Sequence, residues 1–288
     1  MIGQLVQHLL VALITGSGGY LGGHVVETFL AAGYKTVIVA RRNSLILNEK
    51  AIESWKESYF SNLEVIECDL STRDTSLEDC LLNSGTILLG DIDCIISCAS
   101  PFMRSCVNQL EEIVEPTLNI ADNIMTFAAA VRRSQLNGTA INKVQKKRNV
   151  RVVHVSSSAA LRGPGQKPYR STADGGSYID TAQTIFSPLD WNTCSKMSGG
   201  GMQPYQFAKT VSEQIMFERG KESDIDVISI VPVTMLGPVC NAHHLQLRVE
   251  KSQYDYLKAV KGIPGATDGC EERKTFLPGT CATKRHLK

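Results

Sequence analysis

A tyrosine and a lysine lie four positions apart in the stretch GGGMQPYQFAKTVSEQ, residues 199–214. On a helix this spacing places the side chains of Tyr205 and Lys209 on one face. A tyrosine in water has a pKa near ~10, which is too high for proton transfer at neutral pH. Because a neighbouring ammonium favours the phenolate, it lowers that pKa. We therefore expect Tyr205 to act as an acid or base whose pKa is lowered by Lys209.

A glycine-rich turn near the start of the chain indicates what the pair acts beside. In TGSGGYLG, residues 15–22, every third residue from position 16 is glycine. Such a turn lets the backbone approach a pyrophosphate, and the following helix N-terminus offers N–H groups to the phosphates. Because the turn follows a predicted strand and begins a predicted helix, it predicts a dinucleotide site. The residues expected to bind the dinucleotide here are Gly16, Gly19, Tyr20, Leu21 and Gly22.

Two arginines at the end of the second predicted strand indicate which dinucleotide is bound. Sites specific for NAD carry Asp or Glu at this point, whereas this chain has Arg41 and Arg42. Arginine suits a ribose 2′-phosphate, so the sequence predicts NADP(H); two solvated surface arginines are the alternative. We also expect Asp69, after the third predicted strand, to accept a hydrogen bond from the adenine amino group, with a local capping role as the alternative.

A run of hydroxyls, HVSSSAA at residues 154–160, follows the fifth predicted strand. A carbonyl that gains a hydride becomes an alkoxide, which needs a hydrogen-bond donor and then a proton. We expect Ser158 to supply that donor, and Ser156 and Ser157 to cap the turn or touch the nicotinamide. Capping by all of these serines is the alternative. Lys209 is also expected to reach the nicotinamide ribose.

Alternating strands and helices must position these groups. Apolar runs of this kind fit parallel strands buried on both faces, and their alternation with helical patterns predicts a Rossmann-like, doubly wound α/β sheet. In that architecture ligands bind at the carboxyl edge of the sheet. Strands are predicted at Val11–Thr15, Thr36–Ala40, Glu64–Cys68, Cys94–Ser97, Val150–Ser156 and Asp226–Val231, and helices at Gly22–Ala32, Glu111–Val131 and Tyr205–Glu218.

The sequence predicts that two segments are insertions. Residues 132–149 are basic, and we expect a solvated loop there, with a docking patch for an anionic partner as the alternative. Residues 162–203 are long and rich in Gly, Pro and Ser, which is typical of a functional or disordered loop. We predict an NADP-binding domain over residues 1–238, followed by a small, shortened substrate lobe and tail over residues 239–288.

Composition narrows the classes of protein further. The 288 residues carry a net charge of +1, which gives no indication of nucleic acid or an anionic membrane as a partner. No apolar run reaches the ~18 residues of a membrane-spanning helix. The nine cysteines form no CxxC pair, so we expect a cytoplasmic protein. No metal is expected, because Cys240, His243 and His244 lack a fourth ligand nearby.

Taken together, these motifs resemble the extended short-chain dehydrogenase/reductase superfamily, and within it the dihydroflavonol 4-reductase and cinnamoyl-CoA reductase group. The resemblance covers about residues 10–265 and places Ser158 at the catalytic serine position and Arg41 against the 2′-phosphate. Further matching segments line the cofactor or flank the catalytic helix: Asp69-Leu70, Cys98-Ala99-Ser100-Pro101-Phe102, Asp190-Trp191-Asn192, Pro232 and Leu236-Gly237-Pro238. Of these, we expect Leu70, Ala99, Ser100 and Pro232 to contact the cofactor.

The sequence therefore predicts an NADPH-dependent reductase of a small-molecule ketone or aldehyde. Because dimers are frequent in this superfamily, a homodimer is possible. Three departures from the family accompany this prediction: a long separation between Ser158 and Tyr205, the basic insertion, and an early end of the chain. The alternatives are a nucleotide-sugar epimerase or dehydratase and, because of the shortened C-terminus, a non-catalytic NADP(H)-binding protein.

Overall fold

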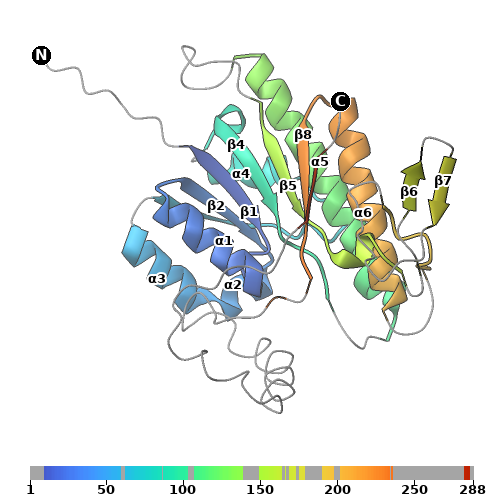
Figure 1. The fold of residues 1–288 in the computed structure, drawn as a ribbon. Coiled ribbons are helices and arrows are strands. Elements are labelled where there is room, and N and C mark those ends of the chain that lie inside the picture. Colours follow the sequence, from blue (N-terminus) through green and yellow to red (C-terminus); the bar gives the residue numbers. More distant parts are fainter. Residues whose placement is uncertain are drawn as a thin grey trace, which may run out of the picture.

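A computed structural model gives the fold of the chain (Figure 1). It describes residues 10–59, 62–85, 87–102, 107–138, 149–163, 166, 169–172, 175–178, 190–197, 202–233, 235 and 282–285.

A seven-stranded sheet forms the centre of the molecule, in the spatial order β3-β2-β1-β4-β5-β8-β9. All neighbouring pairs are parallel except β8 and β9, which are antiparallel. This order, with the chain crossing from β3 over to β4, confirms the predicted doubly wound sheet. The strands are β1 (Val11–Thr15), β2 (Lys35–Ala40), β3 (Leu63–Glu67), β4 (Ile92–Ser97), β5 (Arg151–Val155), β8 (Asp226–Val231) and β9 (Ala282–Arg285).

Helices cover both faces of the sheet (Figure 1). Against one face, Leu30 of α1 and Trp55 of α3 pack on Ile14. Against the other, Ile124 of α5 and Met216 of α6 belong to the larger core cluster. The strands are thus buried on both sides, which explains their nearly continuous apolar sequences. The helices are α1 (Tyr20–Ala31), α2 (Arg42–Leu47), α3 (Glu49–Tyr59), α4 (Leu77–Ser84), α5 (Glu115–Leu136) and α6 (Gln203–Glu222).

The predicted basic loop over residues 132–149 was wrong at its start, because α5 continues to Leu136. Arg132 is only 6% exposed, and its guanidinium donates to Asp224 at 2.9 Å, which links α5 to the end of α6. The Gln135 side chain donates to the Ile92 carbonyl at 2.8 Å and accepts from the Val150 amide at 3.0 Å. These polar side chains therefore anchor α5 between two strands. The lysines of the segment lie outside the described residues.

The second predicted insertion contains an antiparallel hairpin of β6 (Tyr169–Thr172) and β7 (Gly175–Tyr178). Of the predicted substrate lobe, the structure describes only β9, which pairs with β8 at the edge of the sheet. Residues 239–281, with Cys240, His243 and His244, lie outside the described residues. The domain boundary at residue 238 stays a prediction.

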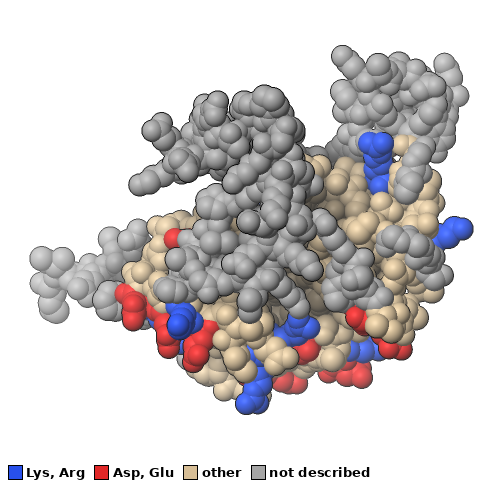
Figure 2. Space-filling view, turned by 90° about the horizontal axis from the view of Figure 1, so that it is seen from below, with Lys and Arg blue, Asp and Glu red and all other residues tan. Residues whose placement is uncertain are grey.

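The described surface carries charges of both signs. On the face shown in Figure 2, lysine and arginine side chains are interspersed with aspartate and glutamate side chains. This mixture accords with the net charge of +1 for the whole chain. Within the described ranges, every helix is too short or too polar to cross a bilayer.

Candidate active site

A single cavity of about 1520 Å³ joins the carboxyl ends of the parallel strands to the start of α6. Its volume exceeds the ~300–1,000 Å³ of ordinary small-molecule sites, which suits a dinucleotide together with a second ligand. The predicted residues that line it are Gly16, Gly19, Tyr20, Leu21, Gly22, Arg41, Asp69, Leu70, Ala99, Ser100, Ser156, Ser158, Tyr205, Lys209 and Pro232. Arg42 is not among the lining residues.

The glycine turn is shaped by close backbone contacts. Gly16 adopts a left-handed φ of +73°, a region that favours glycine. A Cβ on Gly22 would lie 2.0 Å from the Gly16 carbonyl oxygen, so α1 can pack this closely only without a side chain there. Gly19 is the N-cap residue of α1 and has no side chain to cap the first amides. The turn therefore presents bare backbone to the cavity, as phosphate binding requires.

The neighbouring strand end is held against this turn. The Ala99 amide donates to the Thr15 hydroxyl at 3.2 Å, and the Cys98 amide donates to the Thr15 carbonyl at 3.3 Å. A Cβ on Gly16 would approach the Ala99 nitrogen to 2.6 Å. The ends of β1 and β4 thus form one continuous floor of the cavity, with Ala99 and Ser100 on it.

The two arginines occupy different places. Arg41 is the N-cap residue of α2 and lines the cavity, whereas Arg42 is the first residue of that helix. Asp69, which follows β3, also lines the cavity, and its carboxylate accepts from the Ser71 amide at 3.0 Å. The structure therefore contains the local cap that was the alternative role for Asp69, and the residue still faces the cavity.

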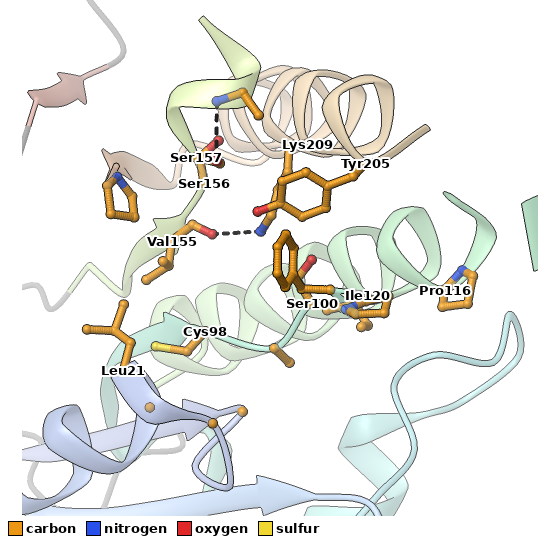
Figure 3. A pocket seen from close by; sticks show the side chains of 18 of the residues that line it. Leu21, Cys98, Ser100, Pro116, Ile120, Val155, Ser156, Ser157, Tyr205 and Lys209 are labelled. Atoms are coloured by element: carbon orange, nitrogen blue, oxygen red, sulfur yellow. Dashed lines mark hydrogen bonds between the residues drawn. The ribbon is translucent and has the colours of Figure 1, made fainter. Parts of the chain in front are cut away.

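Helix α6 carries the tyrosine and the lysine into the cavity, one helical turn apart (Figure 3). Lys209 is only 4% exposed, and its ammonium donates to the Val155 carbonyl at 3.1 Å, at the last residue of β5. Burial lowers the pKa of Lys209 to about 8, against the opposing effects of Cys98 and Glu213. A lysine with this pKa is mostly charged at neutral pH and can lose its proton just above it.

The pKa of Tyr205 moves in the direction opposite to the prediction. Burial raises it, and a hydrogen bond with the Ser157 side chain opposes that rise without reversing it. The ring of Phe102 covers Tyr205 edge-on, with ring centroids 5.0 Å apart. Desolvation by the surrounding side chains thus outweighs the hydrogen bond from Ser157, and the phenol keeps its proton at neutral pH.

The serines of the hydroxyl run have three different environments. The Ser156 hydroxyl donates to the fully buried Glu213 of α6. Ser157 interacts with Tyr205, and its hydroxyl also accepts from the Ala159 amide at 3.2 Å. Ser158 begins a short 3-10 turn, η4 (Ser158–Ala160), and its amide donates to the Pro232 carbonyl at 3.0 Å.

The structure therefore brings Ser157, rather than the predicted Ser158, to the tyrosine. Strand β5 ends at Val155, one residue before the predicted end at Ser156. Ser157 is therefore the second residue after the strand, the position that Ser158 would hold after a strand ending at Ser156. The sequence signal for Ser157 was present in the run itself, but hydroxyls at adjacent positions could not be told apart without the strand end.

A buried asparagine braces this serine turn, a role that the sequence did not reveal. Asn192 is 5% exposed; its side chain donates to the Ala159 carbonyl and its amide to the Ala160 carbonyl, both at 2.8 Å. Gln166 adds to the brace by donating to the Trp191 carbonyl and accepting from the Thr193 amide at 3.1 Å. In the sequence, the Asp190-Trp191-Asn192 stretch pointed to this region, but only as a segment that resembles the family and without a role for Asn192.

Among curated proteins, the chain is similar to cinnamoyl-CoA reductase 1 of Arabidopsis thaliana, with 25% identity over 249 residues. It is also similar to tetraketide alpha-pyrone reductase 1 of Arabidopsis thaliana, with 23% identity over 227 residues. These matches cover 86% and 78% of this chain, but the chain spans only 58% and 57% of the length of these relatives.

Solved structures show the same fold. The methylglyoxal/isovaleraldehyde reductase Gre2 of yeast, complexed with NADPH, has a TM-score of 0.56 at 19% identity, covering 81% of this chain and 60% of that one. The NADPH complex of Gre2 from Candida albicans has a TM-score of 0.62 at 18% identity, covering 87% and 65%. The family described as NAD dependent epimerase/dehydratase matches residues 12–252. Because that match takes in the glycine turn, the serine run and the Tyr-Lys helix, the chain belongs to the NAD dependent epimerase/dehydratase family.

Proposed function

We propose that the protein is an NADPH-dependent reductase that transfers a hydride to the carbonyl carbon of a ketone or aldehyde. The observation that carries this proposal is the meeting of Ser157, Tyr205 and Lys209 in the cavity that the glycine turn also lines. Family membership and two relatives that are reductases by name support it.

The residues at the other end of the cavity fit NADP(H). The glycine turn would hold the pyrophosphate, since a Cβ at Gly22 would fill the space that lets α1 approach the turn. Arg41 would pair with the 2′-phosphate, and Asp69, which also lines the cavity, would accept a hydrogen bond from the adenine amino group. When bound with its nicotinamide towards α6, the reduced cofactor supplies the hydride.

The catalytic residues then divide the remaining work. The Ser157 hydroxyl donates to the carbonyl oxygen and polarises it. The Tyr205 phenol gives its proton to that oxygen as negative charge develops there. Lys209, charged below a pKa of about 8, stabilises the phenolate that is left and holds its position through the Val155 carbonyl. Because burial raises the pKa of Tyr205, the phenol is protonated at neutral pH, which is the form that reduction requires.

Replacement of Tyr205 by phenylalanine tests the assignment. The Tyr205→Phe variant removes the proton donor and keeps the ring that packs on Phe102. We expect reduction to fall by about 10²–10⁴-fold, the usual contribution of a general acid. Calorimetric titration with NADPH should give an unchanged dissociation constant. Undiminished turnover would reject the assignment.

The substrate is expected to be apolar around its carbonyl group. Near Tyr205 the cavity is lined by side chains that stay exposed although they are apolar: Phe102 at 52%, Met202 at 38% and Val233 at 56%. Exposed apolar groups of this kind occur at binding sites more often than on the rest of a protein surface. An aromatic or long-chain carbonyl compound would cover them, which a screen of ketones and aldehydes of increasing apolar area can check.

The family match also supports a second function, epimerisation or dehydration of a nucleotide sugar. Arg41 disfavours it, because enzymes of that kind often retain NAD(H). Parallel titrations with NADPH and NADH, followed by the carbonyl screen, separate the two functions. Tight NADPH binding without turnover of any carbonyl compound would instead favour a binding protein. A homodimer and a cytoplasmic location are further predictions for the same protein.

A further inference from the structure

Two cysteines meet at the edge of the cavity, beside its lining residue Asp69. Cys68 follows β3 and lines the cavity, and Cys80 lies on α4. Both are free thiols, and their sulfur atoms are 3.0 Å apart. A disulfide requires ~2.05 Å between the sulfurs, so an approach of about 1 Å is enough to form one. We propose that Cys68 and Cys80 form a reversible disulfide, a modification site at the edge of the cofactor cavity.

Rigid elements hold both thiols where they meet. The Cys68 amide donates to the Ala40 carbonyl at 3.0 Å, which continues the ladder between β2 and β3. On the other side, Ser76 caps α4 by accepting from the Asp79 amide at 3.1 Å. Leu81, next to Cys80, is fully buried in the same core cluster as Cys68. The backbones on both sides are thus anchored by hydrogen bonds and core packing, which holds the two sulfur atoms close together.

The two thiols also differ in their exposure to solvent, and this difference determines which of them reacts first. Cys68 is 5% exposed, and burial raises the pKa of its thiol, whereas Cys80 is only partly buried. Hydrogen peroxide would therefore react first at Cys80, whose sulfur takes one peroxide oxygen to form a sulfenic acid while one water leaves. The Cys68 sulfur then attacks the Cys80 sulfur and a second water leaves. Two thiols lose two electrons and two protons, and the peroxide is reduced to two waters.

The position of the bond gives it a consequence for the cavity. Residues 69–79, between the two cysteines, include the cavity-lining residues Asp69, Leu70 and Ser71. The disulfide would tie both ends of this segment together and fix that wall to α4. The link to the dinucleotide rests on the proposed function, whereas formation of the disulfide does not.

Peptide mapping of the full chain after treatment with hydrogen peroxide tests the proposal. Trypsin cleaves after Arg73, between the two cysteines, so the disulfide joins two peptides that are otherwise separate. We expect loss of the free Cys68 peptide, appearance of the joined species, and its return to separate peptides with dithiothreitol. Fragment spectra must assign the bond to Cys80, because the second peptide also contains Cys94 and Cys98.

Variants provide the controls. Cys80→Ser should abolish the joined species, and Cys94→Ser, which alters a partly buried thiol on β4, should leave it intact. Cys68 that stays reduced while Cys80 is oxidised further, or that joins a different cysteine, would overturn the proposal. The wild-type map alone decides this even if a variant fails to fold. Because the readout is a mass, an inactive reductase would count against the proposed function and leave this result untouched.

Discussion

The two ends of the cavity are built on different principles. At the glycine turn the wall is backbone, and the side chains that reach it, such as Arg41 and Asp69, are exposed. At α6 the wall includes the buried side chain of Lys209, which is 4% exposed, and Glu213 of the same helix is fully buried. The glycine-turn end selects a ligand by its shape, and the protein side chains that the ligand meets there are already solvated by water. The α6 end keeps the Lys209 ammonium away from water, which lowers its pKa.

At the α6 end, several buried polar groups have no hydrogen-bond partner among the described residues. His154 of β5 is 3% exposed, and burial, with a smaller contribution from Lys209, lowers its pKa to about 3, so the ring is neutral. Its neighbours in register on the adjacent strands are Ser97 and Ser229. Within the described part of the chain, neither hydroxyl nor either ring nitrogen has a hydrogen-bond partner. Burial of these polar groups without hydrogen-bond partners costs the fold stability.

The largest difference is expected at the serine run, where the structure and the sequence disagree by one residue. Ser157→Ala should lower kcat by about 10²–10³-fold, the usual effect of losing one donor to a developing oxyanion. Ser158→Ala is the matched control. It should change kcat by less than about 3-fold, since Ser158 bonds to Pro232, Leu161 and Arg162 through its backbone, which the substitution keeps. Steady-state kinetics of both variants decide between them. The reverse order of effects would restore the original assignment to Ser158.

At the dinucleotide end a single methyl group should be enough to disturb binding. Gly22→Ala places a Cβ 2.0 Å from the Gly16 carbonyl oxygen, and overpacking of this kind costs ~1–3 kcal/mol, or roughly 10–100-fold in NADPH affinity. At Gly19 the corresponding distance is 3.2 Å, so Gly19→Ala should disturb the packing of α1 less and lower the affinity for NADPH less than Gly22→Ala does. Calorimetric titration of both variants measures the effect. Equal affinities would contradict the close packing of α1 on the turn.

The pH dependence should report the buried lysine. Its pKa in the folded protein, about 8, lies below the ordinary 10.5, so the unfolded chain binds more protons between these values. Lys209 therefore makes stability rise with pH across that window, while activity falls as the ammonium is lost above pH 8. A profile of kcat/KM against pH should show this alkaline limb, and Lys209→Met should remove it. The Tyr205 phenol cannot produce a limb near 8, since burial raises its pKa.

The smallest effect is expected at the exposed arginines. Arg41→Ala should raise the KM for NADPH by about 10-fold, the loss of a charged hydrogen bond of ~1.5–3 kcal/mol partly replaced by water. The KM for NADH should stay the same, because that cofactor lacks the 2′-phosphate. Arg42→Ala is the control, since Arg42 does not line the cavity. A larger effect at Arg42 than at Arg41 would place the phosphate elsewhere.

The sequence predicted the dinucleotide end more exactly than the catalytic end, for a physical reason. Strand β1 and the glycines after it follow from apolar burial and backbone sterics, which are local in the chain. The choice between Ser157 and Ser158, the direction of the Tyr205 pKa shift and the brace by Asn192 depend on contacts between distant segments. The same holds for Arg132, whose burial against Asp224 overrides its place in a basic stretch. Spacing alone gives no measure of how far a side chain is removed from water.

The brace formed by Gln166 and Asn192 also bears on which changes of sequence the serine turn can tolerate. The Asn192 side chain donates to the Ala159 carbonyl in the serine turn and accepts from the Cys194 amide, while the Gln166 side chain accepts from the Gly163 and Thr193 amides. A change of length or composition between residues 167 and 189 should therefore leave the serine turn in place as long as Gln166 and Asn192 keep these bonds.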